Sequence, residues 1–114
     1  MQGVGDLLGK EISGVAFVRD HVEFHFDGVI LRSIADPYVT VGEATYRFSK
    51  AGSREALCMA IGSIVEWLNL VEGEHFEFAT GNGCRIRIPL DAASQKRGEA
   101  MHLAAGSNQP LRIW

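Results

Sequence analysis

The sequence holds only three prolines and two cysteines in 114 residues, and it contains no long apolar run. A membrane-spanning helix needs roughly 18 or more apolar residues in a row, so we expect no membrane span. The first residues, MQGVGDLLGKE, lack the basic and apolar regions of a signal peptide. Cys58 and Cys84 form neither a CxxC pair nor a disulfide framework, and we expect reduced thiols. These absences together predict a cytoplasmic protein without a membrane partner.

Positive charge is also sparse, because no run of Lys or Arg exceeds two residues. The net charge is −3 and the isoelectric point is about 5.7. Proteins that bind nucleic acid usually carry a basic stripe and a high isoelectric point, so we expect no nucleic-acid partner. Hydrophobic residues make up 46% and charged residues 22%, as in ordinary globular domains. We therefore expect residues 1–114 to form a single domain with a small core, and we expect a homodimer, because a second copy would add stability.

Thirteen glycines separate short apolar segments, a pattern typical of β-strands joined by tight turns. Residues 21–26 alternate, with Val22, Phe24 and Phe26 on one face and polar residues on the other. Asp27-Gly28 is a strong hairpin signal because both residues accept a positive φ. Further strands are expected at the following segments: 11–19, 29–34, 39–41, 44–48, 63–71, 74–78, 84–89, 99–105 and 111–114. For residues 99–105 a helix is the alternative, since Ala, Met and Leu favour it.

One helix is predicted over residues 54–61. Ser53 is suited to cap its N-terminus, and Gly62 to end it. Leu57, Ala60 and Ile61 recur at helical spacing, which gives an apolar stripe to lie on a sheet.

Two parts of the chain are similar to each other, residues 8–34 and residues 61–88. The offset is 53 residues at Gly9 and Gly62, 54 at His21 and His75, and 55 at Arg32 and Arg87. A three-stranded sheet has an apolar face that it cannot cover alone, and a second copy can cover it. The predicted fold is therefore α+β and mainly antiparallel β: two related three-stranded meanders packed as a sandwich or partly open barrel, with one short helix.

The strongest candidate for chemistry is His21-x-Glu23-x-His25, whose side chains share one face of a strand. His75 and Glu77 occupy the matching positions in the second segment. Two imidazoles and a carboxylate could bind zinc or iron if the strands converge, and this would make the protein a metal- or ligand-binding protein or an enzyme. The other interpretation is the solvent face of a half-buried sheet, where such residues pair across strands. We favour the second interpretation and expect no cofactor.

Other residues are candidates for contact with a partner. Arg32, Arg85 and Arg87 lie on expected outer strand faces and could bind a small anion or an acidic partner, or pair with Glu23 and Glu77. Trp67 and Trp114 are of the residue type enriched at protein interfaces, although Trp114 could instead belong to a core strand. No serine nucleophile elbow is present, and the Gly-rich turn at residues 80–83 joins two strands, unlike a phosphate-binding loop.

The segments FDGVILRSI, FATGNGCRIRI and GEAMHLAAGSNQPLRIW, after a start such as LLGKEISGVAF, resemble small bacterial β-rich proteins of uncharacterised families. Some similar chains are immunity proteins of polymorphic toxin systems. That resemblance implies a protein that blocks a partner toxin by surface complementarity, and it carries no catalytic motif. We therefore expect a non-catalytic protein-interaction module, with the metal- or ligand-binding protein and the immunity-type protein as alternatives.

Overall fold

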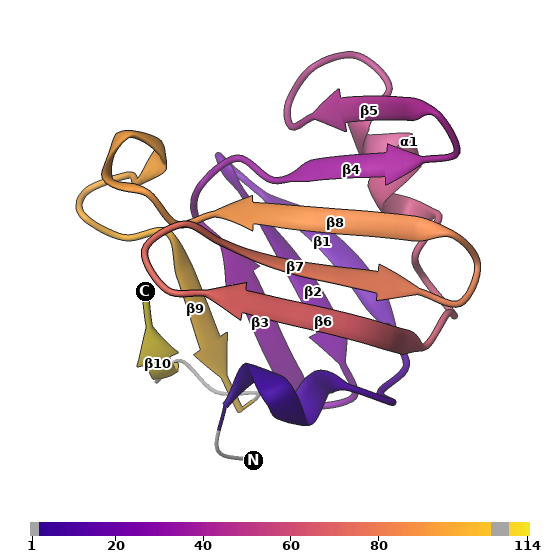
Figure 1. Ribbon diagram of the computed structural model, residues 1–114, viewed down its shortest axis with the longest axis horizontal. Coiled ribbons are helices and arrows are strands. Elements are labelled where there is room, and N and C mark those ends of the chain that lie inside the picture. Colours follow the sequence, from indigo (N-terminus) through magenta and orange to yellow (C-terminus); the bar gives the residue numbers. More distant parts are fainter. Residues whose placement is uncertain (1–2, 106–109) are drawn as a thin grey trace.

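The fold consists of two five-stranded antiparallel sheets packed face to face, in a computed structural model that describes residues 3–105 and 110–114 (Figure 1). The first sheet has the strand order β1 (Gly14–Val18), β2 (His21–Phe26), β3 (Val29–Ser33), β9 (Met101–Ala104) and β10 (Pro110–Ile113). The second has the order β5 (Ala44–Arg47), β4 (Tyr38–Val41), β8 (Cys84–Pro89), β7 (His75–Thr80) and β6 (Val65–Val71). The helical elements are η1 (Val4–Leu7), α1 (Ser53–Cys58) and η2 (Ala92–Ser94). The predicted α+β sandwich of two meanders is confirmed.

The two meanders, β1-β2-β3 and β6-β7-β8, pair in the same register. Glu23 lies opposite Arg32 in the first, and Glu77 lies opposite Arg87 in the second. Each meander is then extended by a hairpin from the other part of the chain: β9-β10 continues from β3, and β4-β5 continues from β8. Each sheet is thus completed by a distant segment of sequence, an arrangement that Figure 1 shows directly.

The segments before β1 and β6 meet at one corner of the sandwich, where Glu11 pairs with Ile64. Two matched pairs of backbone hydrogen bonds join these segments. In the first pair, the Ile12 N–H donates to the Ser63 carbonyl and the Val65 N–H donates to the Lys10 carbonyl, both at 2.9 Å. In the second pair, the Gly9 N–H donates to the Val65 carbonyl and the Gly62 N–H donates to the Ile12 carbonyl, both at 2.8 Å. Gly9 and Gly62 have nearly equal positive φ angles, 83° and 85°. Residues related by the 53-residue offset therefore exchange equivalent bonds, so this corner has approximate twofold symmetry. The strands themselves begin at Gly14 and Val65, later than the sequence pattern predicts.

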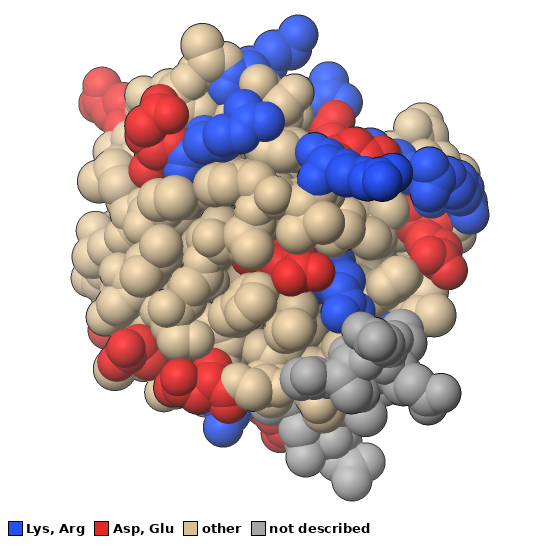
Figure 2. Space-filling view, turned by 180° about the vertical axis from the view of Figure 1, so that it is seen from behind, with Lys and Arg blue, Asp and Glu red and all other residues tan. Residues whose placement is uncertain are grey.

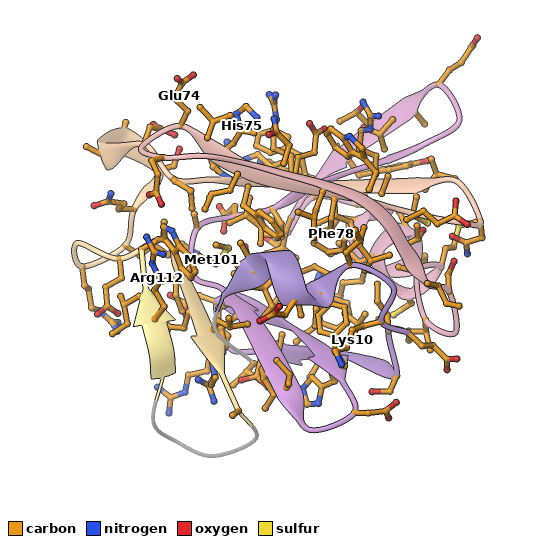
Figure 3. The ribbon with its side chains drawn as sticks, turned by 60° about the horizontal axis from the view of Figure 1, so that its bottom comes forward. Lys10, Glu74, His75, Phe78, Met101 and Arg112 are labelled. Carbon is orange, nitrogen blue, oxygen red and sulfur yellow. The ribbon has the colours of Figure 1, made fainter. Side chains whose placement is uncertain are left out.

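The core lies between the sheets and is built on phenylalanine. Phe24, Phe76 and Phe78 are at most 1% exposed, and the Phe24 and Phe78 rings meet edge to face with centroids 5.5 Å apart. Such aromatic pairs contribute about 0.5–1.5 kcal/mol beyond the burial of their area. Figure 3 shows Phe78 pointing into the space between the sheets. The alternation predicted for residues 21–26 is confirmed, because its apolar face is the buried one, and the strand expected at residues 74–78 corresponds to β7, with Phe76 and Phe78 buried.

The helix differs from the prediction. α1 ends at Cys58, and the chain continues to Ile61 through i→i+3 hydrogen bonds, so residues 59–61 are turns. Its N-cap is Gly52, with φ 86°, whereas Ser53 is fully buried and its hydroxyl has no hydrogen-bond partner. Leu57 and Ala60 face the core as expected, but Ile61 is 44% exposed. A helix of six residues is too short to carry the full stripe, and it is held by packing beside β4 and β1.

The C-terminal segments form strands, so the helical alternative for residues 99–105 is wrong. β9 pairs with β3 on one side and with β10 on the other, and these long-range hydrogen bonds override the local helix propensity. The sequence also predicts a turn over residues 106–110, of which residues 106–109 lie outside the described residues. No helix among the described residues has the length and apolar character needed to cross a bilayer.

Candidate functional site

On the outer face of the first sheet, Glu23 is the centre of a closed polar cluster. Its Oε2 accepts a hydrogen bond from Arg32 Nε at 3.0 Å, and its Oε1 lies 3.1 Å from His25 Nε2. His21 Nε2 lies 3.4 Å from Oε2. An ionised carboxylate can only accept hydrogen bonds, so the ring nitrogens that face it carry protons. The Glu23 side chain is only 15% exposed, which makes this cluster a compact, internally satisfied unit.

The cluster lowers the pKa of Glu23. Burial by itself raises this pKa, because it disfavours the charged form. The hydrogen bonds from Arg32, His25 and His21, together with the positive charge of Arg32, outweigh burial. The pKa of Glu23 therefore lies below its ordinary value, and the carboxylate is ionised at neutral pH.

The proposed metal ligands are not brought together. β2 and β7 belong to different sheets whose phenylalanine faces meet, so His21 and His25 lie on one outer face and His75 on the opposite one. Figure 3 shows His75 pointing outward from β7, on the side away from Phe78. Within the part of the chain that the structure describes, no three His, Cys, Asp or Glu side chains are arranged to hold a metal ion. The alternative in which the strands converge on a metal therefore has no support in the arrangement of the described residues, and the favoured interpretation of two outer sheet faces agrees with the geometry.

The outer face of the second sheet carries the equivalent glutamate in a different arrangement. Glu77 lies opposite Arg87 in the β7–β8 register, but its Oε2 is 3.8 Å from Nε of Arg85, which comes from the neighbouring row. The Arg85 guanidinium also stacks over the Trp67 ring, 5.0 Å from its centroid. The Arg87 side chain is exposed and, among the described residues, makes no hydrogen bond or ion pair. The second sheet therefore presents a free guanidinium where the first has a closed ion pair.

A groove of about 550 Å³ opens on this face. Its lining combines both signs of charge with hydroxyl groups and one aromatic ring: Tyr38, Thr40, Thr45, Glu74, His75, Glu77, Arg85, Arg87, Pro89, Asp91 and Ser94. Four of the predicted site residues are therefore in the groove, namely His75, Glu77, Arg85 and Arg87. Thr40 and Thr45, which line the groove from β4 and β5, were missed by sequence reasoning, because nothing in the local pattern shows that this hairpin pairs with β8.

The two tryptophans differ in exposure. Trp67 is 40% exposed beside the groove, in keeping with an interface role. Trp114 packs against the core, and its backbone N–H donates to the Met101 carbonyl at 2.8 Å. Trp114 thus belongs to the core edge, the second of the two interpretations of this residue.

The face that carries the first sheet shows a mixture of both charges among its described residues (Figure 2). Figure 2 looks onto the side that carries the first sheet, and Lys/Arg and Asp/Glu side chains are interspersed across it. Both cysteines are free, and burial raises the pKa of the Cys84 thiol, an effect that the neighbouring Thr80 hydroxyl only partly offsets. Cys84 is therefore a neutral core residue at physiological pH.

Comparison of the chain with known protein families, characterised proteins and solved structures finds no match. The groove and its surroundings are therefore the features that bear on function.

Proposed function

We propose that the protein is a non-catalytic protein-interaction module that binds its partner through the outer face of the second sheet. The observation that carries this proposal is the free guanidinium of Arg87 in the groove, opposite a glutamate that is engaged by another arginine. Guanidinium groups recognise carboxylates through paired hydrogen bonds, so the chemistry offered to a partner is acid recognition.

The residues around Arg87 support this assignment. Trp, Tyr and Arg are the side chains that most often dominate binding energy at protein interfaces. Trp67, Tyr38 and Arg85 surround or line the groove, and the stacking of Arg85 on Trp67 holds both side chains in place before a partner arrives. Such preorganisation lowers the entropic cost of binding.

The proposal is tested by selecting random displayed peptides on the immobilised protein. We expect enrichment of peptides that contain Asp or Glu. Their binding should fall at least about tenfold on Arg87→Ala and on Trp67→Ala, since these are central interface side chains. Lys10→Ala is the matched control, because Lys10 is an exposed cation without a side-chain partner among the described residues, and Figure 3 shows it well apart from Glu74 and His75. No enrichment, or enriched peptides that bind Arg87→Ala as tightly as the parent, would overturn the proposal.

A further inference from the structure

The geometry points to a specific ligand for this groove: an extended peptide segment that carries two opposite charges, a carboxylate bound by Arg87 and a basic side chain bound by Glu74 and Asp91. This inference rests on the proposed function and adds the chemistry of the partner. It follows from how charge is distributed along the groove, which is positive in the middle and negative at one end.

The positive site exists because the equivalent cross-strand Glu–Arg pair forms an ion pair in the first sheet but not in the second. In the first sheet, position 25 is a histidine that hydrogen-bonds Glu23 at 3.1 Å, and Arg32 also binds that carboxylate. In the second sheet, the matching position is Ala79, which pairs with Trp67 on one side and Arg85 on the other. The small alanine leaves room for Arg85 to extend over it and reach Trp67 and Glu77. Arg85 thereby takes the carboxylate that Arg87 would otherwise bind.

The negative end is formed where β7 begins and β8 ends. The Leu90 N–H donates to the Glu74 carbonyl at 2.9 Å, which places the neighbouring Asp91 beside the start of β7. Glu74 is exposed and, among the described residues, its carboxylate has no partner, while Asp91 accepts a bond from Ser94 at 2.8 Å. Figure 3 shows Glu74 and His75 together on the outer side of the sheet.

The two ends are suitably spaced for one short segment. Pro89 and Asp91 follow Arg87 by two and four residues along β8 and its continuation. At about 3.3 Å per extended residue, Asp91 at the negative end lies roughly 13 Å from Arg87. Side chains four residues apart in an extended peptide point to the same face and lie about 13 Å apart, so an acidic and a basic residue at that spacing reach both ends. A segment with only acidic residues would place a negative charge against Glu74 and Asp91.

The test uses four capped decapeptides of alanine and threonine, titrated into the isotope-labelled protein and followed by amide chemical shifts. One carries aspartate and lysine four residues apart, and the others carry aspartate alone, lysine alone or neither. We expect the doubly charged peptide to shift amides of β4, β7 and β8 and to bind about threefold or more tighter than either singly charged one, in line with partly exposed ion pairs. Arg87→Ala should remove the contribution of the aspartate alone, and Glu74→Gln combined with Asp91→Asn that of the lysine alone.

The remaining outcomes separate this inference from the proposed function. If the aspartate peptide binds as tightly as the doubly charged one, and still depends on Arg87, the acid-binding interface stands and the dipolar ligand is wrong. If no peptide shifts the groove amides, the dipolar ligand is wrong, and the proposed function then depends on the displayed-peptide selection alone. Lys10→Ala should leave all four affinities unchanged, and thermal unfolding of each variant establishes that it is folded.

Discussion

Arg32 and Arg87 hold matching positions in the two meanders, yet only Arg32 is ion-paired. Both lie directly opposite a glutamate, Glu23 or Glu77, in an antiparallel register. In the first sheet the side chains close on one another at 3.0 Å, whereas in the second a competing arginine engages the glutamate. One backbone arrangement thus supports a sealed polar cluster on one face and an open groove on the other, and the difference arises from a few side chains.

Removing Arg85 should close the groove. In Arg85→Ala, the carboxylate of Glu77 loses its nearest cation, and Arg87 is the cross-strand neighbour able to replace it. Double-mutant cycles between Glu77→Gln and Arg87→Ala measure this. We expect a coupling energy near zero in the parent and about 0.3–1 kcal/mol in the Arg85→Ala background. Equal coupling in both backgrounds would show that Arg85 does not hold Arg87 free.

Glu23 should make stability depend on pH. Its pKa is lower in the folded protein than in the unfolded chain, so its contribution to stability is fully present above the unfolded value, about 4.3. That contribution is lost as the pH falls through the lower, folded value. Denaturant unfolding from about pH 6 to pH 2 should show a steeper loss of stability in the parent than in Glu23→Gln. Glu43→Gln, which removes an exposed carboxylate without a side-chain partner among the described residues, is the control and should keep the parent slope.

Much of this fold could be predicted from the sequence, because strand alternation and tight turns are determined by residues adjacent in the chain. The alternation over residues 21–26 determines which face is buried, and Asp27-Gly28 marks a hairpin because Asp27 and Gly28 both adopt positive φ, 50° and 99°. The helix boundaries were less predictable. Whether residues 59–61 continue as helix or as turns depends on tertiary packing and on the corner bonds of Gly62, and neither is visible in helical spacing.

The candidate site was predictable in part. Side chains alternate between the two faces of a strand, so the outward direction of Glu77, Arg85 and Arg87 could be predicted and these residues could be identified as site candidates. The groove could not, because its other wall comes from a hairpin that crosses from one part of the chain to the other sheet. Nor does spacing reveal which of two arginines will engage one glutamate. That choice depends on the size of Ala79 and on the presence of Trp67 across the strand.

The phenylalanine contact between the sheets should dominate the stability of the core. Phe78→Ala removes a ring that touches Phe24, Phe26 and Phe76, and we expect a loss of about 3–5 kcal/mol in the free energy of unfolding. Ile61→Ala is the contrasting control, because Ile61 is 44% exposed despite its apolar character, and it should cost no more than about 0.5 kcal/mol. Urea denaturation measures both. A comparable loss at Ile61 would contradict its assignment to the surface.

Because each part of the chain contributes a hairpin to the other sheet, we expect the protein to stay folded after the backbone is cleaved between the two parts. A protease site inserted between Lys50 and Ala51, both exposed, separates β1–β5 from β6–β10. Each fragment still contributes strands to both sheets, since β4-β5 pairs with β8 and β9-β10 pairs with β3. Neither fragment can therefore leave without breaking two sheets and the core between them. After cleavage, the fragments should co-elute at the size of the intact protein and separate only in denaturant. Dissociation in native buffer would mean that the pairing across the halves is too weak to hold the sandwich together.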